Sequence, residues 1–255
     1  MSRSQPFMPP AERALRARSF GSVAAEYARG RPGYPAELVE WALGPEPLDV
    51  LDVGAGTGKL TEAVAARHRV VAIEPLAQMR ALLEERLPDV RVVEGSAEEL
   101  PVAGESVDAV VVGAAFHWFD HEQALAEIAR VLRGPSVLVL VGNSFDTSVE
   151  WQAELREILG SATLGRPGHW PEPERLARTF AEVDDRDFPH VQQITLAQLR
   201  DYASSRSSFA VLPEQVRAER LAEIDALWRR TPALSEAGAA EIRWVARARR
   251  CRRLR

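Results

Sequence analysis

Three closely spaced glycines after an apolar run are the part of the sequence best suited to bind a small ligand. They are Gly54, Gly56 and Gly58, in the string from Val50 to Lys59. Glycine has no side chain, so it permits tight turns and lets the backbone approach a bound group. A strand that ends in such a turn and leads into a helix is a common way to hold a nucleotide or a related cofactor.

Two phosphate-binding interpretations of this string lack residues that their chemistry needs. A P-loop has a glycine five positions before its Gly-Lys pair and a hydroxyl residue after the lysine, whereas this chain has Val53 and Leu60 there. A dinucleotide-binding turn has its third glycine three positions after the second, where this chain has Lys59. The string therefore fails as a P-loop, and the dinucleotide interpretation is weakened but stays open.

The same string resembles motif I of the class I S-adenosylmethionine-dependent methyltransferases. The resemblance implies that the backbone of the loop approaches the amino-acid end of that cofactor. It also implies that Asp52, two residues before the first glycine, helps to hold the ammonium group. The implied loop contacts are Gly54, Ala55, Gly56, Thr57 and Gly58. A cationic ligand without phosphate needs no cluster of basic residues, which agrees with this stretch.

A second carboxylate follows the next apolar run. Glu74 lies sixteen residues beyond Gly58, after residues 70–73, and precedes Pro75. One carboxylate can accept hydrogen bonds from two adjacent hydroxyls, as an adenosine ribose presents them. Together with the resemblance, this position assigns Glu74 and Pro75 to the ribose.

The resemblance extends to the expected surroundings of the adenine and the methyl group. Met79 matches a side chain that packs on adenine, and the string Ser96-Ala97-Glu98 matches a loop that lines it. Members often carry an aspartate where this chain has Ser96, so either Ser96 or Glu98 is expected to bond the adenine amino group. Ala114 and Ala115, after the fourth apolar run, are expected to face the cofactor.

The segment from Phe20 to Pro35 resembles a subgroup of small-molecule methyltransferases that includes the trans-aconitate methyltransferase-like proteins. The similarity rests on its aromatic residues and on the string Arg31-Pro-Gly-Tyr-Pro35. It implies a lid that folds over the cofactor, with Tyr27 and Arg31 near the cofactor and Tyr34 near the acceptor. Ordinary packing of a first helix is an equal alternative for the two tyrosines.

Methyl transfer to a hydroxyl or an amine requires loss of a proton, whereas a carboxylate acceptor needs no base. His117 follows the fourth apolar run and is the candidate base; packing beside Trp118 is the alternative. Trp118 and Arg206 are candidate acceptor contacts, and Arg31 and Arg206 are the arginines that would bind a carboxylate acceptor. Because no histidines and carboxylates share metal-ligand spacing, we predict no metal.

Alternating strands and helices are needed to position these residues, and the apolar periodicity predicts them. Strands are expected over residues 48–53, 70–73, 90–93, 107–112 and 137–141, and helices over residues 36–43, 59–67, 76–86 and 123–132. Continuous apolar strands are typical of parallel sheets covered on both faces. We therefore predict a doubly wound α/β fold. The resemblance further implies the Rossmann-like class I methyltransferase fold, with a seven-stranded mixed sheet and an antiparallel last strand.

We expect an N-terminal arm and lid over residues 1–34 and a methyltransferase domain over residues 35–255. The core of that domain is expected over residues 48–142, followed by a helical insertion and closing strands over residues 143–255. Within this last part we expect helices over residues 151–159, 174–180, 195–202 and 213–230, a loop over residues 165–171 and a strand over residues 241–251.

The composition is that of a folded protein and excludes disordered, collagen-like and disulfide-stapled classes. The 255 residues are 46% hydrophobic and carry a formal net charge of −5, so nucleic acid is not an expected partner despite the arginine-rich tail. The single cysteine excludes an intrachain disulfide and fits a cytoplasmic location. The apolar runs are too short to span a membrane, and no membrane partner is expected.

These observations favour an enzyme that transfers a methyl group from S-adenosylmethionine to a small-molecule acceptor, as a monomer or homodimer. Methylation at oxygen, nitrogen or a carboxyl group stays open. One alternative is a non-catalytic S-adenosylmethionine-binding module. A weaker one, because of the glycine spacing, is an NAD-dependent oxidoreductase.

Overall fold

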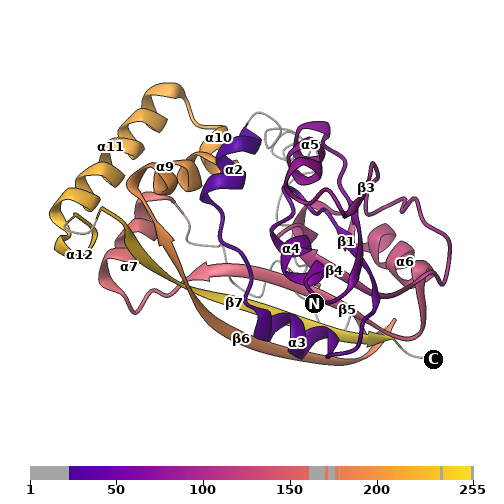
Figure 1. The fold of residues 1–255 in the computed structure, drawn as a ribbon. Coiled ribbons are helices and arrows are strands. Elements are labelled where there is room, and N and C mark those ends of the chain that lie inside the picture. Colours follow the sequence, from indigo (N-terminus) through magenta and orange to yellow (C-terminus); the bar gives the residue numbers. More distant parts are fainter. Residues whose placement is uncertain (1–22, 161–169, 172–175, 178, 236–237, 254–255) are drawn as a thin grey trace, which may run out of the picture.

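A computed structural model describes residues 23–160, 170, 171, 176, 177, 179–235 and 238–253 (Figure 1). Its main feature is one seven-stranded sheet with the order β3-β2-β1-β4-β5-β7-β6. The strands are β1 (Asp49–Val53), β2 (Arg69–Ile73), β3 (Arg91–Val93), β4 (Val107–Gly113), β5 (Leu132–Phe145), β6 (Phe180–Ile194) and β7 (Ala240–Arg253). Strands β1 to β5 pair in parallel, and β7 runs antiparallel to β5 and to β6. The predicted mixed sheet with an antiparallel last strand is confirmed.

The helices fall into two groups at opposite ends of the long strands. Helices α4, α5 and α6 lie around β1 to β4, whereas α7 and α9 to α12 gather at the far end of β6 and β7 (Figure 1). Helix α2 lies between the two groups, and α3 lies against the sheet. Their bounds are α2 (Ala24–Gly30), α3 (Ala36–Leu43), α4 (Lys59–Ala65), α5 (Ala77–Arg86), η2 (Phe116–Trp118), α6 (His121–Val131), α7 (Glu150–Ile158), α9 (Leu196–Ser204), α10 (Ser207–Ala210), α11 (Glu214–Arg230) and α12 (Pro232–Ser235).

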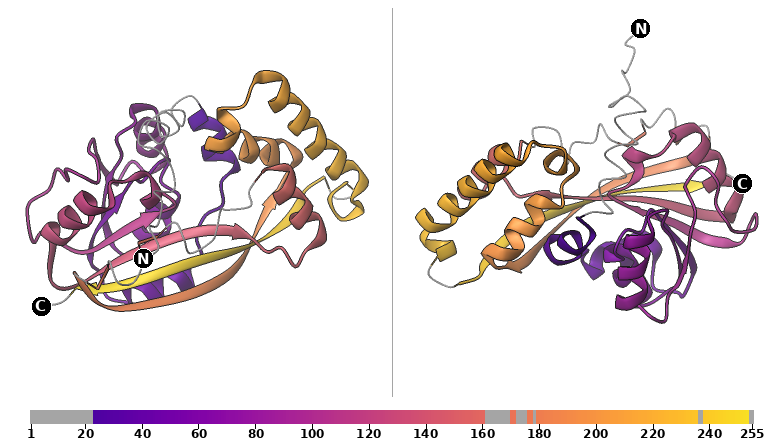
Figure 2. Two further views of the ribbon diagram at one scale, coloured as in Figure 1. Left: turned by 180° about the vertical axis from the view of Figure 1, so that it is seen from behind. Right: turned by 90° about the horizontal axis from the view of Figure 1, so that it is seen from above.

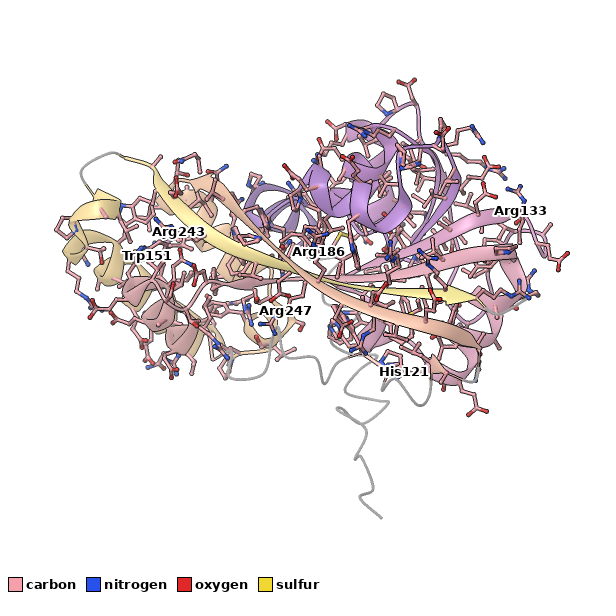
Figure 3. The ribbon with its side chains drawn as sticks, turned by 90° about the horizontal axis from the view of Figure 1, so that it is seen from below. His121, Arg133, Trp151, Arg186, Arg243 and Arg247 are labelled. Carbon is pink, nitrogen blue, oxygen red and sulfur yellow. The ribbon has the colours of Figure 1, made fainter. Side chains whose placement is uncertain are left out.

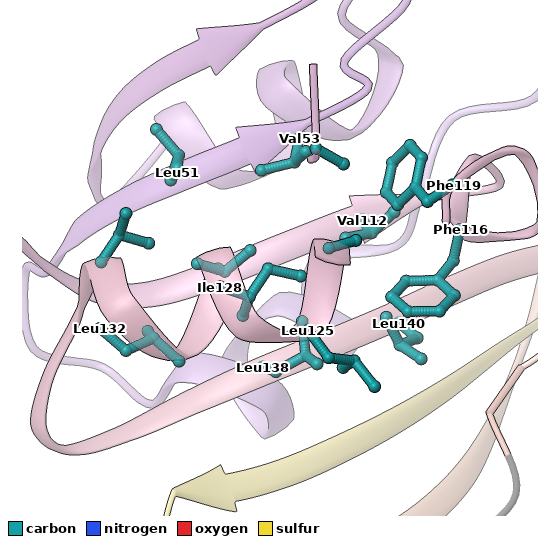
Figure 4. Packing of buried hydrophobic residues seen from close by; sticks show 14 of the residues in the cluster. Leu51, Val53, Val112, Phe116, Phe119, Leu125, Ile128, Leu132, Leu138 and Leu140 are labelled. Atoms are coloured by element: carbon teal, nitrogen blue, oxygen red, sulfur yellow. The ribbon is translucent and has the colours of Figure 1, made fainter. Parts of the chain in front are cut away.

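The apolar strands and α6 form the main core. In Figure 4, Ile128 and Leu125 of α6 face Leu138 and Leu140 of β5, with Phe116 beside them. These side chains are at most 7% exposed, and full burial of one such side chain contributes about 1.5–3 kcal/mol. Burial along the whole of each central strand explains why their sequence patterns are continuous rather than alternating. The core holds the carboxyl ends of β1 and β4 in register.

Side-chain caps are present at the starts of two predicted helices: α9 begins one residue after the predicted start at residue 195, and α6 begins two residues before the predicted start at residue 123. Asp120 accepts hydrogen bonds from the amides of Glu122 and Gln123 at the start of α6. Thr195 and Gln198 form a reciprocal capping box at the start of α9. Side-chain oxygens at these positions satisfy amides that have no partner within the helix. The predicted helix over 36–43 also matches α3 without change.

The strand β6 is the largest element that our sequence-based prediction did not locate. It is acidic and contains Pro189, so its sequence lacks both the apolar run and the alternation of a strand. The predicted helix over residues 174–180 is wrong at Phe180, which begins β6, although Leu176 is helical. Residues 172–175 lie outside the described part of the chain. A proline and charged residues are typical of an edge strand, which is the position of β6.

The arginines near the C-terminus pair with the acids of β6. Arg249 is 6% exposed and binds both carboxylate oxygens of Asp185 at 2.7 Å, and its Nη1 donates to the carbonyl oxygen of Pro171. Arg247 faces Asp187 on the partner strand and lies near the middle of the β6–β7 ribbon in Figure 3. Cross-strand charge pairs of this kind stabilise neighbouring strands. They therefore compensate for the few apolar side chains of β6.

A second hydrophobic cluster joins the C-terminal helices to the far end of the sheet. Trp244 of β7 is 1% exposed and stacks on Phe145 of β5, with ring centroids 4.5 Å apart. Tyr202 of α9 meets both rings edge-on. The views in Figure 2 show that β5, β6 and β7 run from the α4–α6 group to this helical group. The two groups therefore share the strands of one sheet.

Some sequence-based expectations concern segments that the structure does not describe. Residues 1–22 of the predicted arm and lid and most of the predicted loop over residues 165–171, including His169, lie outside the described residues. Trp170 and Pro171 at the end of that loop are described. Among the described residues, no helix has the length and apolar character needed to cross a membrane.

Candidate functional site

The glycine string forms the turn between β1 and α4. The amides of Gly54 and Ala55 both donate to the carbonyl oxygen of Ile73, the last residue of β2, at 2.9 and 3.0 Å. Gly58 has a left-handed conformation, with φ of 82°, and is the N-cap residue of α4. The turn thus lies at the carboxyl ends of two parallel strands, where α/β sheets bind their ligands.

The three glycines have different surroundings. A Cβ on Gly54 would lie 2.7 Å from the Cβ of Ala115, and a Cβ on Gly58 would lie 2.9 Å from Cγ of Leu83. Of the atoms in the described residues, a Cβ on Gly56 would meet only Cε1 of Tyr27, at 3.9 Å. Gly54 and Gly58 are therefore required by packing, whereas the described part of the chain leaves room for a side chain at Gly56 beside Tyr27.

Asp52 is fully buried at the end of β1. Its Oδ2 accepts a hydrogen bond of 2.6 Å from the hydroxyl of Thr61, whereas its Oδ1 finds no partner among the described residues. The hydroxyl of Thr57 is also buried and has no described partner. Burial raises the pKa of Asp52 to about 7, and the Thr61 hydrogen bond opposes that rise. A buried carboxylate with one oxygen to spare suits a cationic ligand.

Glu74 is 5% exposed and is held between the glycine loop and α5. Its Oε2 accepts from the amide of Gly56 and its Oε1 from the amide of Leu76, both at 2.9 Å. Burial raises its pKa, and these two backbone hydrogen bonds oppose the rise. Arg80 donates to the carbonyl oxygens of Glu74 and Pro75. Each carboxylate oxygen has a further lone pair, so Glu74 can still accept from a ribose.

The residues expected around adenine lie beside this corner. Met79 is 2% exposed on α5, and Ala97 is 3% exposed in the main core. Glu98 accepts from the amide of Asp120 at 2.7 Å, so one oxygen of this carboxylate holds the start of α6. Ser96 forms an isolated bridge with Glu99. Of the two residues expected to bond adenine, Glu98 thus already has a structural role.

The chain turns sharply after β4. Ala114 has a left-handed φ of 54°, and its amide donates to the carbonyl oxygen of Val141 at 2.7 Å. Such a conformation is strained for alanine and is often found at functional sites. Ala115 packs in the main core, and His117 and Trp118 follow in η2 with ring centroids 4.5 Å apart. Trp118 also packs against the main core, so the structure supplies packing contacts for both rings.

Helix α2 connects the glycine loop to the C-terminal helices. The Arg31 guanidinium lies 4.7 Å from the ring centroid of Tyr27 and 5.2 Å from that of Tyr202. Its Nε donates to the hydroxyl of Ser205 at 3.0 Å. Arg206 is 3% exposed and donates to the Tyr202 hydroxyl at 3.1 Å. Tyr202 therefore brings the two predicted arginines together, next to the tyrosine that covers Gly56.

The segment between α2 and α3 contacts the sheet. The Tyr34 hydroxyl lies 3.2 Å from the position that a Cβ on Gly113 would occupy, and burial raises its pKa. The side-chain amide of Asn143 donates to the carbonyl oxygen of Gly33, and Nε2 of His190 lies 2.9 Å from Oδ1 of Asn143. These contacts fix Tyr34 beside the carboxyl end of β4.

Sequence reasoning missed Thr61, Asn143, His190, Tyr202 and Ser205. A signal for Thr61 was present, because it lies one residue after Leu60 and three before Val64, both of which face the sheet from α4. No such signal existed for His190, because its strand was not predicted. The contacts of Tyr202 and Ser205 with Arg31 join residues more than 170 positions apart, so local pattern does not show them.

The arrangement fits S-adenosylmethionine on the grounds of two observations. Asp52 Oδ1 is a buried acceptor without a described partner, and Gly56 opens onto space that a side chain would fill. Asp52, the glycine loop, Glu74 and Tyr27 meet at one corner of the sheet. Among the described residues, no group of three or more histidine, cysteine or acidic side chains is placed to hold a metal ion.

Comparison with known proteins gives the family. A family model described as a methyltransferase domain matches residues 51–140. An uncharacterized methyltransferase of Mycobacterium tuberculosis is 39% identical over 230 residues, which cover 89% of this chain and 92% of the relative. The chain belongs to the methyltransferases. An uncharacterized methyltransferase of Schizosaccharomyces pombe is 31% identical to this methyltransferase and covers 84% of it.

Solved structures agree with this methyltransferase in fold. A putative type II methyltransferase from Anaeromyxobacter dehalogenans superposes with a TM-score of 0.60 at 22% identity, over 88% of this chain and 97% of that one. A putative methyltransferase from an antibiotic biosynthesis pathway of Anabaena variabilis gives a TM-score of 0.57 at 23% identity, over 83% and 95% of the two chains. The predicted class I, Rossmann-like methyltransferase fold is confirmed.

Proposed function

We propose that this methyltransferase uses S-adenosylmethionine to methylate a small-molecule acceptor. The observation that carries the proposal is Asp52, a fully buried carboxylate with one oxygen that has no described partner, next to the open position at Gly56. The ammonium group of the cofactor would bind Asp52 Oδ1, and its ribose hydroxyls would bind Glu74. Both contacts need acceptor oxygens, and carboxylates supply them.

S-adenosylmethionine, when bound, supplies a methyl group on a sulfonium that leaves as a neutral thioether, so the donor needs no activation by the protein. The chain then has to orient the acceptor and exclude water. Tyr27 covers the glycine loop, and Tyr34 lies beside the end of β4. His117, just beyond β4, is the candidate that would take a proton from a hydroxyl or amine acceptor.

The charge distribution supports a small molecule rather than nucleic acid as the acceptor. The net charge is −5, and four arginines of β7 pair with acids of β6 instead of forming an open basic surface, namely Arg247, Arg249, Arg250 and Arg252. Nucleic-acid binding depends on arginines and lysines that are available to phosphates. Arg31 and Arg206, which share Tyr202, would suit an acceptor that carries a carboxylate. Trp118 and Tyr34 are further candidate acceptor contacts.

Isothermal titration calorimetry with S-adenosylmethionine, S-adenosylhomocysteine and NAD tests the proposal. We expect the first two to bind with roughly micromolar affinity and NAD to give no heat. Binding of NAD alone would contradict the cofactor assignment. Transfer of a labelled methyl group to a panel of small acids, alcohols and amines then separates an enzyme from a non-catalytic binding module, which would bind the cofactor and transfer nothing.

Glu74→Ala is expected to weaken S-adenosylhomocysteine and adenosine binding by about 10–100-fold, the value of a hydrogen bond to a charged group. The variant removes the acceptor for the ribose hydroxyls and also the bond to the amide of Gly56. The measurement is a calorimetric titration with both ligands. Glu94→Ala removes a carboxylate that pairs with Arg80 at the surface and is the control. Unchanged adenosine affinity would mean that Glu74 serves the loop alone.

A further inference from the structure

The hydrogen bond between Thr61 and Asp52 is a feature of the site that the sequence did not reveal. Thr61 is the third residue of α4 and is fully buried. Its hydroxyl donates to Oδ2 of Asp52 at 2.6 Å, a short distance that is typical of a hydroxyl bonded to an ionised carboxylate. The bond fixes one oxygen of the carboxylate and leaves Oδ1 as the oxygen without a described partner.

The electrostatic surroundings make this bond important for the charge of Asp52. Burial raises the pKa of Asp52 to about 7, and the negative charge of Glu74 adds to the rise. Burial and nearby charges, including that of Asp52, raise the pKa of the Tyr34 hydroxyl, so this phenol is neutral near pH 7 and adds no charge beside Asp52. The side chain of Thr61 and, to a smaller extent, its backbone lower the pKa again. Without the hydroxyl, a larger share of the protein would carry a neutral Asp52 near neutral pH.

We propose that Thr61 is a positioning residue that keeps Asp52 ionised and turned so that Oδ1 meets the ammonium group of the cofactor. The proposal rests on the proposed use of S-adenosylmethionine. Gly58 caps the start of α4 in a left-handed conformation, and the first turn of the helix presents Thr61 to the end of β1. The hydroxyl of Thr61 therefore links the first turn of α4 to the carboxylate of Asp52, which is proposed to bind the cofactor.

Thr61→Val tests the proposal, because valine has nearly the same shape but cannot donate a hydrogen bond. We expect the dissociation constant of S-adenosylmethionine to rise about tenfold or more relative to the parent at about pH 6, since a change of one in pKa alters the ionised fraction tenfold. The ratio of the two constants should fall toward one by about pH 9, where Asp52 is ionised in both proteins. The ammonium group of the cofactor titrates alike with both proteins, so it cancels in the ratio.

Two further variants separate charge from packing. Thr61→Ser keeps the hydroxyl and is expected to keep the affinity of the parent within about threefold. In an Asp52→Asn background, where no cofactor binding is expected, Thr61→Val should change the melting temperature equally at about pH 5 and about pH 8, because the titrating group is gone. A loss of affinity that is equal at every pH, or no loss, would overturn the proposal.

The carboxyl group can also be observed without any cofactor. Carbon-13 NMR of aspartate-labelled, ligand-free protein should show the Asp52 midpoint at higher pH in Thr61→Val than in the parent and in Thr61→Ser. An unchanged midpoint would overturn the role of Thr61, even if the cofactor binds. A parent protein that binds neither S-adenosylmethionine nor S-adenosylhomocysteine would instead overturn the proposed function, so the two failures are distinguishable.

Discussion

Asp52→Asn is expected to abolish measurable S-adenosylmethionine binding and yet to stabilise the ligand-free protein at pH 8. Loss of binding follows because asparagine carries no charge to match the cofactor's ammonium group; we expect at least about a 100-fold weaker affinity, the upper range for a hydrogen bond to a charged group. The stabilisation follows from the raised pKa. Calorimetric titration and thermal unfolding of the same samples measure the two effects.

The sign of the stability effect follows from proton linkage. Asp52 has a pKa of about 7 in the folded chain against an ordinary value of 3.8, so the folded form holds its proton more tightly than the unfolded form. The contribution of Asp52 to the free energy of unfolding is therefore fully present below about pH 4 and is lost as the pH rises to about 7. At pH 8 the ionised, buried carboxylate costs up to about 4 kcal/mol, which asparagine avoids. The gain in melting temperature should shrink at about pH 5.

Asp49→Asn is the matched control, because Asp49 lies three residues earlier on the same strand. Arg69 and Arg133 hold its pKa below the ordinary range, so the charged form stabilises the fold. The same substitution should therefore lower stability slightly at pH 8 and leave cofactor affinity unchanged. A destabilised Asp52→Asn protein at pH 8 would contradict the view that the carboxylate is kept for binding at the expense of stability.

The part of the fold that buries apolar strands was predictable from sequence. The strands β1, β2, β4 and β5 are rich in valine, leucine and isoleucine, because helices cover both faces of the sheet. The β6 strand lacks this enrichment, since it lies at the edge and is held by ion pairs with arginines of β7. Arg249 and Asp185 are 64 positions apart, so neither residue's local sequence shows the pairing.

The candidate site also has one part that the local sequence shows and another part that it does not. Asp52 and the glycines carry a local pattern, and the structure places them in one turn at the end of β1. The side of the site formed by Tyr27 and Arg31 depends on the close packing of α2 against α9. A Cβ on Gly30 would lie only 2.3 Å from the backbone nitrogen of Tyr202. That contact is set by the shapes of two distant helices. Arg31 was expected near the cofactor because its string resembles the lid segment of a known subgroup, whereas its partners Ser205 and Tyr202 carry no local pattern and were not found.

Gly56→Ala is expected to remove cofactor binding while the protein remains folded. The Cβ would enter the space below Tyr27, where the amino-acid end of the cofactor is proposed to lie. No described atom stands closer than 3.9 Å to that Cβ, so the fold itself has room for it. The left-handed φ of 58° adds a backbone penalty of about 1–2 kcal/mol.

Gly160→Ala isolates that backbone penalty from the loss of space. Gly160 has a similar φ of 65°, no atom of the described residues lies within 4 Å of its Cβ position, and it follows α7, away from the glycine loop. Both variants should lose similar stability in denaturant unfolding, but only Gly56→Ala should lose affinity for S-adenosylmethionine, by about 100-fold or more, as expected when a group occupies the ligand's space.

Gly54→Ala would behave differently again, because its Cβ would collide with Ala115 at 2.7 Å and impair folding itself. Parent-like affinity in a folded Gly56→Ala protein would show that the cofactor does not approach this turn, and the assignment of Asp52 to its ammonium group would then fail as well.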